Sequence, residues 1–238
     1  MSHAFLRYAS RAFFLQDLVA KAIGLLPPII QNNLGKYDSL KKAFYLASHD
    51  GVEGDYLEFG VFTGASLAAA IHLSRRSFLP RQAPMRYFGF DSFAGFGKVT
   101  EEERGHQWHR DENFKSNADM VRRRLARLVD DPSRVRLIEG YYDSTLSARN
   151  PSDYGIGKAA VILIDCDTFT AARPVFEFIM PALQEGTILV IDDFFLYKGS
   201  STLGVYGAFR QFERDLKDWR LRQMWSYGCG GVAYIVSR

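Results

Sequence analysis

Apolar residues along this chain gather in short blocks that predict buried strands. A run such as residues 159–164 (AAVILI) has no polar position, which is typical of a strand covered on both faces. Strands are predicted over residues 55–61, 85–90, 134–140, 159–165 and 187–192, and a closing antiparallel pair over residues 221–226 and 231–237. Most of the sheet is therefore expected to be parallel and covered by helices.

Helical spacing fills the segments between these strands. Apolar positions recur every three or four residues over residues 37–48, 65–75, 117–129, 169–183 and 204–217. This alternation of strand and helix favours an α/β fold with a doubly wound, mostly parallel seven-stranded sheet. The exception is the polar stretch 92–113, which has no clean period, carries His106 and His109, and is predicted to be a functional loop.

The N-terminal 50 residues are predicted to form a helical lid or oligomerisation segment, followed by the sheet domain in residues 51–238. Residues 12–30 are the most apolar stretch, and an amphipathic helix covering part of the domain is expected there. Asp17, Lys21 and the Pro27-Pro28 pair interrupt it, whereas a membrane span needs roughly 20 largely uncharged residues. The same charges argue against a signal peptide. Docking of this helix on a membrane surface or a partner is the alternative.

Composition narrows the class of protein further. Apolar residues make up 47% and charged residues 24% of the 238 positions, which excludes wholesale disorder. The net charge of +3 is too small for a nucleic-acid surface, so no nucleic-acid partner is expected. The only cysteines, Cys166 and Cys229, allow neither a disulfide framework nor a four-cysteine zinc site, and a cytoplasmic location is expected.

Polar groups follow the carboxyl end of every predicted parallel strand, where ligands bind in such sheets. Gly60 and Gly64 permit a tight turn before a helix N-terminus, although their G-x-x-x-G spacing differs from that of dinucleotide sites. Glu58 precedes the turn and would attract a cationic group. Asp91 suits the hydroxyls of a ribose, with a cap on its own loop as the alternative. Together they indicate a nucleoside with a positively charged tail, such as S-adenosylmethionine.

Three more aspartates are predicted to converge where adjacent strands end. Asp165, Asp192 and Asp193 would repel one another unless a cation compensates, and their hard oxygen atoms suit Mg²⁺. Asp167 follows two residues after Asp165 and could accept a proton from a substrate hydroxyl. His106 and His109 are the competing candidates for that base.

Four segments together resemble the macrocin O-methyltransferase (TylF/MycF-type) family. They are residues 54–64 (GDYLEFGVFTG), 90–96 (FDSFAGF), 165–167 (DCD) and 191–193 (IDD). The resemblance runs from about residue 40 to residue 212. It implies a Rossmann-like class I methyltransferase domain that uses S-adenosylmethionine and Mg²⁺. It also implies a small-molecule acceptor, a hydroxyl on a sugar or phenol of a natural product, and a homo-oligomer, expected here as a dimer.

The resemblance also implies roles for individual residues. Asp165, Asp192 and Asp193 match the metal ligands, and Asp167 matches a proposed general base. Glu58, Gly60 and Gly64 would line the methionine end of the cofactor, Asp91 would contact the ribose, and Asp143 falls where the family has a residue near the adenine. The further predicted cofactor contacts are Phe62, Thr63, Ser66, Ser92, Gly140 and Asp165. The loop over residues 98–113 departs from the family pattern, and Ala65 and Glu185 replace glycines that are usual there.

Three other functions stay open at this level. Catechol-type O-methyltransferases share the fold and the metal position but carry a lysine where this chain has Thr168. A nicotinamide-dependent oxidoreductase could use a similar sheet, although the G-x-G-x-x-G pattern is absent. A non-catalytic cofactor-binding protein is the third possibility, and the intact acidic trio argues against it, since a retired site need not keep repelling charges.

Overall fold

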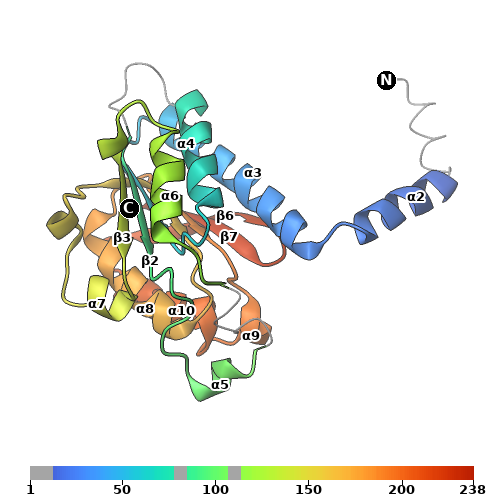
Figure 1. Cartoon of the computed structure of the whole chain (residues 1–238). Coiled ribbons are helices and arrows are strands. Elements are labelled where there is room, and N and C mark those ends of the chain that lie inside the picture. Colours follow the sequence, from blue (N-terminus) through green and yellow to red (C-terminus); the bar gives the residue numbers. More distant parts are fainter. Residues whose placement is uncertain (1–12, 78–84, 107–113) are drawn as a thin grey trace.

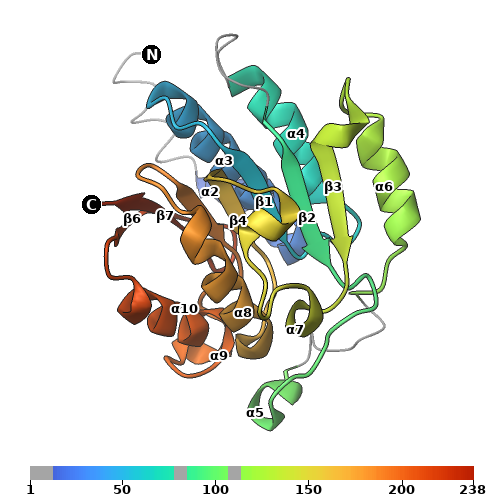
Figure 2. The same ribbon diagram turned by 90° about the vertical axis from the view of Figure 1, so that its left-hand side faces the viewer.

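Seven strands form one twisted sheet in the order β3-β2-β1-β4-β5-β7-β6. The computed structural model describes residues 13–77, 85–106 and 114–238. Five parallel strands come first, and an antiparallel pair closes one edge (Figure 2). Their bounds are β1 Asp55–Phe59, β2 Tyr87–Asp91, β3 Val135–Glu139, β4 Ala159–Ile164, β5 Ile188–Ile191, β6 Arg220–Tyr227 and β7 Gly231–Ser237. The predicted doubly wound α/β sheet is confirmed.

Helices cover both faces of this sheet (Figure 1). One face carries α3 (Pro28–His49), α4 (Ala65–Ser77) and α6 (Ala118–Ala126), and the other carries α8 (Phe169–Ile179) and α10 (Gly204–Asp215). The remaining helices are α2 (Phe13–Gly24), α5 (Glu101–Arg104), α7 (Tyr142–Thr145) and α9 (Leu196–Gly199), with short 3-10 turns at Pro132–Arg134, Pro151–Tyr154 and Met180–Ala182.

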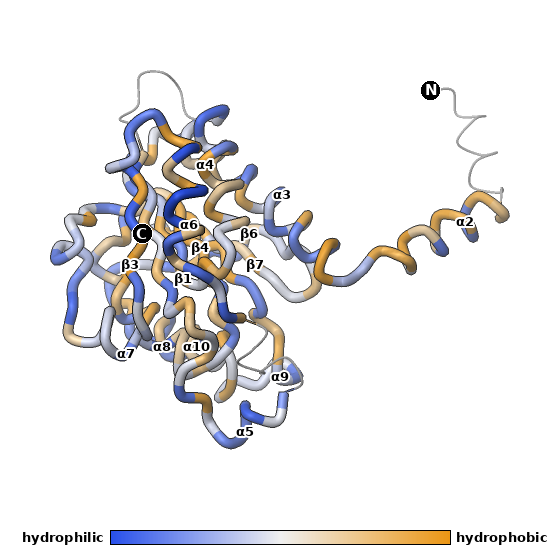
Figure 3. The backbone as a smooth tube through the Cα atoms, viewed as in Figure 1, coloured by the Kyte–Doolittle hydropathy of each residue, from blue (hydrophilic) through white to orange (hydrophobic). Residues whose placement is uncertain are grey.

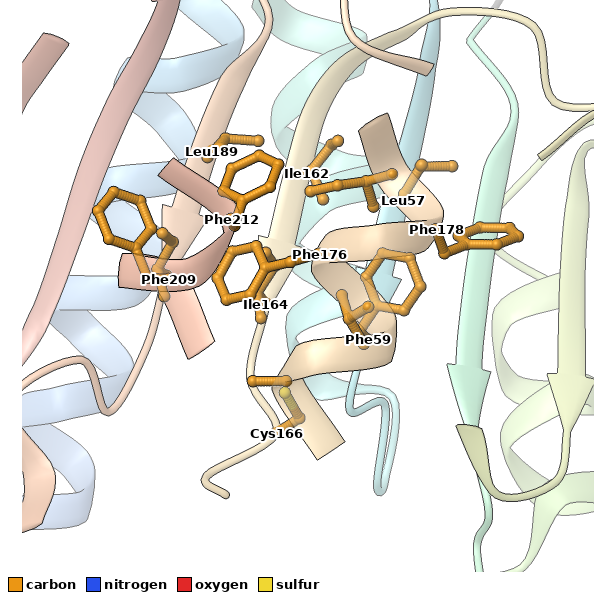
Figure 4. Close-up of a cluster of buried hydrophobic side chains, with 14 of the residues drawn as sticks. Leu57, Phe59, Ile162, Ile164, Cys166, Phe176, Phe178, Leu189, Phe209 and Phe212 are labelled. Atoms are coloured by element: carbon orange, nitrogen blue, oxygen red, sulfur yellow. The ribbon is translucent and has the colours of Figure 1, made fainter. Parts of the chain in front are cut away.

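The strands at the centre are apolar because they are enclosed by these two helical layers. Every residue of β4 is buried, as its unbroken apolar run predicts. On one face, Ile162 and Ile164 of β4 lie beneath Phe176 of α8 and the Phe209 and Phe212 rings of α10 (Figure 4). Phe176 and Phe212 stack with 4.8 Å between ring centroids. This packing buries one face of β4.

The strand order changes direction between β1 and β4. From β1 the chain moves outward through β2 to β3, and it then crosses back to add β4 on the other side. Phe59, Ile164 and Ile191 are register partners at the ends of β1, β4 and β5, so these three strands stop at the same level. Ligands bind at such switch points in open α/β sheets.

The N-terminal part of the chain differs from the prediction of a helix that covers the domain. No residue of α2 is buried, and the helix projects away from the sheet domain (Figure 1). Apolar residues nevertheless run along it (Figure 3). The following helix α3 begins at Pro28 and not at residue 37, because polar contacts and not only apolar ones hold its first half in place.

Among the described residues, no single helix is both long and apolar enough to cross a membrane. Only α2 and α3 taken together pass that test, and an angle of 93° separates them.

The polar stretch 92–113 contains a short helix, α5, where a loop without regular structure was predicted. Thr100 caps it by accepting a hydrogen bond from the Glu103 amide at 3.2 Å. Glu103 is fully buried, and its Oε1 accepts hydrogen bonds from the amides of Phe169 and Gly204, each at 2.8 Å. Because these amides lie at the starts of α8 and α10, the segment is pinned beside the carboxyl end of the sheet. Residues 107–113 of this stretch lie outside the described part.

The turn after β1 lies so close to the end of β4 that only glycine fits at its first position. Gly60 has a φ of +93°, and a Cβ there would lie 1.8 Å from the carbonyl oxygen of Asp165. We therefore expect Gly60→Ala to lower the free energy of unfolding by roughly 3 kcal/mol or more. Gly157, which has open space around it, provides the control, and Gly157→Ala should change stability by no more than about 0.5 kcal/mol. Equal stability of the two variants in urea unfolding would contradict this account.

Candidate active site

The carboxyl ends of β1, β4 and β5 meet in one place. The amide of Asp165 donates to the carbonyl of Phe59 at 2.8 Å, and the amide of Asp192 donates to the carbonyl of Ile164 at 2.8 Å. The residues that directly follow β4 and β5 are thereby drawn together although they are far apart in the sequence. The structure brings together the four aspartates singled out from the sequence.

Three of these aspartates form a cluster suited to a cation. Asp165, Asp167 and Asp193 each offer a carboxylate oxygen, and these oxygens all lie within 4.8 Å of one another. Asp167 and Asp193 have left-handed backbones, with φ of +58° and +51°. Such conformations cost a non-glycine residue on the order of 1–3 kcal/mol and are found mainly at functional sites. The three side chains are half-buried, so the cluster can be reached from solvent.

Asp192 takes a different place from the one predicted. Its side chain is almost completely buried, and its Oδ2 accepts a hydrogen bond from Asn32 Nδ2 at 3.1 Å. The ammonium of Lys36 lies 2.6 Å from the same oxygen and 2.5 Å from Asp165 Oδ2. Asp192 therefore faces helix α3, while Asp193 faces Asp167. The metal set proposed from the sequence and the cluster seen in the structure share Asp165 and Asp193.

Lys36 and Asn32 were not predicted as site residues. They lie one turn apart on α3, and their contacts with Asp165 and Asp192 join residues more than a hundred positions apart. One signal was present in the sequence: Lys36 precedes Leu40 by four residues, which places a lysine on the buried face of the helix. A buried lysine needs a negative partner.

The cluster carries more negative charge than its surroundings can stabilise. Burial, only partly offset by Lys36, raises the pKa of Asp165 to about 7. Burial and then the charge and hydrogen bond of Asp167 raise the pKa of Asp193 well above its usual range. Burial also raises the pKa of Asp167. An added cation would relieve this repulsion, and hard oxygen donors are the ligands that Mg²⁺ and Ca²⁺ prefer. The donor set thus fits a divalent cation.

The glycine turn lies beside this cluster, and Asp91 closes it. Oδ2 of Asp91 accepts hydrogen bonds from the amides of Val61 and Phe62, each at 2.7 Å. Oδ1 accepts one from the amide of Phe93 at 2.7 Å, which is the cap on its own loop that the sequence left open. A carboxylate can accept about four hydrogen bonds. Room for a ribose hydroxyl therefore remains, but positioning the turn is the role that the structure shows.

Glu58 supports the same turn from the protein interior. Its side chain is fully buried and accepts hydrogen bonds from the hydroxyls of Tyr56 at 2.6 Å and Ser66 at 2.8 Å. Burial raises its pKa to about 8. Because none of its surface is exposed, Glu58 does not line the open site in this structure, in contrast to its predicted contact with a cationic ligand.

The other predicted cofactor contacts spread along the strand ends. Phe62 and Thr63 are exposed on the turn, and Gly64 follows with a φ of +75°. Ser92 lines a cavity of about 250 Å³ together with Phe93, Asn117 and Glu139. Gly140 directly follows β3, and Asp143 lies exposed on α7, where Lys98 Nζ is 3.9 Å from its carboxylate.

Of the two histidines proposed as bases, the structure describes one. The ring of His106 lies 5.1 Å from the ring of Tyr197 on α9, measured between centroids. Burial and then the nearby charges of Glu103, Asp167 and Asp193 raise the pKa of Tyr197, so this tyrosine adjoins the acidic cluster. Tyr197 was not predicted. His109 lies outside the described residues.

Comparison with known proteins identifies the family of this chain. The sequence profile of the macrocin O-methyltransferase (TylF) family matches residues 29–219. The chain belongs to this family. The match covers the five parallel strands and ends just before β6, and it includes nearly all of α3, the helix that brings Asn32 and Lys36 to the aspartates.

Two curated relatives are similar over most of this chain. Mycinamicin III 3''-O-methyltransferase of Micromonospora griseorubida is 27% identical over 71% of the chain and 66% of its own length. The 8-demethyl-8-(2,3-dimethoxy-alpha-L-rhamnosyl)-tetracenomycin-C 4'-O-methyltransferase of Streptomyces olivaceus is 29% identical over 68% of the chain and 60% of its own length. The chain thus spans somewhat under two thirds of the length of these relatives.

The fold is also shared with solved structures. CalS11, described as calicheamicin methyltransferase, has a TM-score of 0.68 at 22% identity, and the match covers 93% of this chain and 85% of CalS11.

The position of Thr168 argues against the catechol-type alternative. Its side chain is buried and caps α8 by accepting a hydrogen bond from the Ala171 amide at 3.2 Å. A hydroxyl that caps a helix cannot act as the lysine base of that class.

The buried Glu58 predicts a measurable pH dependence. The pKa of Glu58 is raised from 4.5 to about 8. Protonated Glu58 therefore contributes its full stabilisation below about pH 4.5, and this stabilisation is lost as the pH rises through 8. Glu58→Gln should remove this contribution, which is roughly 5 kcal/mol, from the metal-free protein. We expect the free energy of unfolding of the variant to fall less than that of the original chain between pH 5 and 8.

The control is Glu53→Gln, which alters an exposed glutamate just before β1. The free energy of unfolding of this variant should change with pH in the same way as that of the original chain. Parallel pH profiles of Glu58→Gln and the original chain in chemical unfolding would contradict the raised pKa.

Proposed function

We propose that this chain is an S-adenosylmethionine-dependent O-methyltransferase that methylates a hydroxyl of a small-molecule natural product. The observation that carries the proposal is the cluster of Asp165, Asp167 and Asp193 beside the glycine turn, at the switch in strand order. A donor held by the turn and a hydroxyl held at the carboxylates would be neighbours. Membership of the macrocin O-methyltransferase family supports this reaction and this donor.

A sugar hydroxyl is the acceptor we favour. The Streptomyces olivaceus relative acts, by its name, on a compound with a rhamnosyl group. The three aspartates of the cluster offer polar groups to the hydroxyls of such an acceptor. Polar groups of this kind suit a polyhydroxylated acceptor better than an apolar one. A nicotinamide-dependent oxidoreductase is disfavoured, since Asp91 holds the turn in a form without the dinucleotide glycine pattern.

The chain would hold the donor through backbone groups more than through side chains. The amides of Val61 and Phe62 are taken by Asp91, which keeps the turn between β1 and α4 in one shape. The amides at the start of α4 then face the turn and favour the carboxylate of an amino acid moiety. Ser92 and Glu139, at the neighbouring cavity of about 250 Å³, provide polar groups for the nucleoside end.

Asp165 and Asp193, which belong both to the predicted metal set and to the observed cluster, would hold the divalent cation, for which we propose Mg²⁺, with Asp167 beside them. When bound there, the cation would lower the pKa of an acceptor hydroxyl and fix its orientation. The chain's own contribution is the geometry of the three carboxylates, which two strand ends and two left-handed residues fix in advance. Well-oriented reactants gain roughly 7–11 kcal/mol over free encounter.

Asp167 is the group we propose as the general base. Its pKa is raised by burial, so it binds a proton more strongly than an exposed aspartate would. It would take the proton of the acceptor hydroxyl as the oxygen attacks the methyl carbon. The carbon–oxygen bond forms as the carbon–sulfur bond breaks, and the donor leaves as the neutral thioether S-adenosylhomocysteine. His106 remains the alternative base, and so does His109.

This function predicts a metal-dependent methyl transfer. With S-adenosylmethionine and a panel of sugar- and phenol-bearing acceptors, transfer should stop in EDTA and return when Mg²⁺ is added in excess. Asp167→Asn should lower kcat by about 10²–10⁴-fold, because the base is lost while the shape of the side chain is kept.

The control for this variant is Asp218→Asn, which alters an exposed aspartate after α10 and should leave kcat unchanged. Full activity in EDTA would overturn the metal's role. Unchanged kcat in Asp167→Asn would instead direct attention to His106 and His109 as the base.

We further propose that the chain acts as a homodimer in the cytoplasm, with α2 as the contact. Apolar side chains cover this helix, among them Phe13 (73% exposed), Leu18 (58%) and Ile23 (58%). A helix of 12 residues with no buried residue is marginal in water, so we propose that another surface covers it. One acidic and one basic residue, Asp17 and Lys21, give it no basic face for a membrane, which favours a second copy. The free thiols of Cys166 and Cys229 accord with a reducing compartment.

Light scattering of the full chain tests this contact. We expect a dimer for the original chain and a monomer when Leu18 and Ile23 are both replaced by Glu, because two charges would enter the apolar contact. Lys21→Gln, on the polar side of the same helix, should remain dimeric. A monomeric original chain, or a dimeric double variant, would contradict the role of α2.

A further inference from the structure

Lys36 places a positive charge inside the acidic cluster from a distant part of the chain. Its side chain is almost completely buried, and its Nζ lies 2.5 Å from Asp165 Oδ2 and 2.6 Å from Asp192 Oδ2. Burial alone would lower the pKa of this lysine, but attraction to Asp165 and Asp192 outweighs burial, and the pKa stays well above its usual value. Lys36 therefore lies in the site as a cation paired with two carboxylates.

Contacts between helix α3 and the β6–β7 hairpin fix the position of this lysine. Gly35 packs so closely on the turn between β6 and β7 that a Cβ there would lie 2.5 Å from the amide nitrogen of Gly228. Asn32 Oδ1 accepts a hydrogen bond from the Cys229 amide at 2.9 Å, and Ser39 Oγ accepts one from Trp225 Nε1 at 2.8 Å. The first half of α3 is thus held against the β6–β7 hairpin, with Lys36 directed toward the aspartates.

One ammonium does not balance the charges gathered here. Asp165, Asp167, Asp192 and Asp193 lie around a single described lysine side chain. Asp192 Oδ1 is buried without a hydrogen-bond partner among the described residues. An unsatisfied buried carboxylate oxygen is costly, so the site still favours additional positive charge.

A divalent cation and Lys36 would both bind the carboxylate of Asp165. Asp165 belongs both to the cluster that fits a cation and to the pair that binds Lys36. The two positive charges would also repel each other across a few ångströms of partly buried space. We propose that Lys36 is a resident counter-cation that stabilises the acidic cluster without metal and weakens the binding of the divalent cation by competing for Asp165. This inference rests on the metal site of the proposed function.

Calorimetric titration of Mg²⁺ into the full chain tests the competition without any assay of activity. We expect Lys36→Met to bind Mg²⁺ at least about tenfold more tightly than the original chain, because a competing charge is removed. Lys36→Arg, which keeps the charge, should stay close to the original affinity. Lys41→Met, which removes an exposed lysine from the same helix, should leave the affinity unchanged.

Thermal unfolding provides a second measurement. Without metal, Lys36→Met should unfold at a lower temperature than the original chain, and saturating Mg²⁺ should raise its Tm by more than it raises that of the original chain. If Lys36→Met does not fold without metal, Lys36→Gln, which keeps a hydrogen-bond donor, takes its place in both experiments.

The outcomes separate this inference from the proposed function. Mg²⁺ binding of equal or lower affinity in the neutral variants would overturn the competition and leave the metal site intact. Absence of Mg²⁺ binding in the original chain and in every variant would overturn the metal site itself, and the competition with it.

Discussion

Mutual repulsion among aspartates at the carboxyl ends of β4 and β5 is the constraint on which the rest of this structure depends. Carboxylates taken out of water raise one another's pKa unless positive charge is near, and the pKa of Asp165 reaches about 7 even with Lys36 beside it. The sheet imposes this cost, because the register of β4 and β5 brings the residues after Ile164 and Ile191 to one level. A fold that maintains such an arrangement favours a cation.

The same repulsion connects parts of the molecule that look separate. The N-terminal helix α3 is bound to the sheet through charge as well as apolar packing, since Lys36 and Asn32 contact the aspartates while Leu40 and Phe44 fill the core. Any event that changes the charge at the strand ends therefore acts on the segment that leads to the exposed helix α2. The proposed acceptor and metal sites and the first half of α3 would then share one electrostatic centre.

The sequence predicts the sheet well, because a strand buried on both faces needs an unbroken apolar run, and β4 is the clearest example. It also predicts which aspartates gather, since strand ends in a parallel sheet share one edge. It does not predict what each carboxylate contacts. Asp192 turns toward Lys36, and Glu58 toward Tyr56 and Ser66, through contacts that depend on three-dimensional packing. The exposure of α2 is equally invisible in its apolar pattern, which is also typical of a helix packed on the domain.

Anomalous X-ray scattering from crystals soaked in Mn²⁺ tests the central claim most directly, because manganese takes the same oxygen ligands as magnesium and its position can be seen without assumptions about the protein. We predict one strong peak between the carboxylates of Asp165, Asp167 and Asp193, with the Lys36 ammonium within reach of Asp192 on the far side. A peak only at surface carboxylates, or none at a manganese concentration that saturates the crystal, would contradict the account.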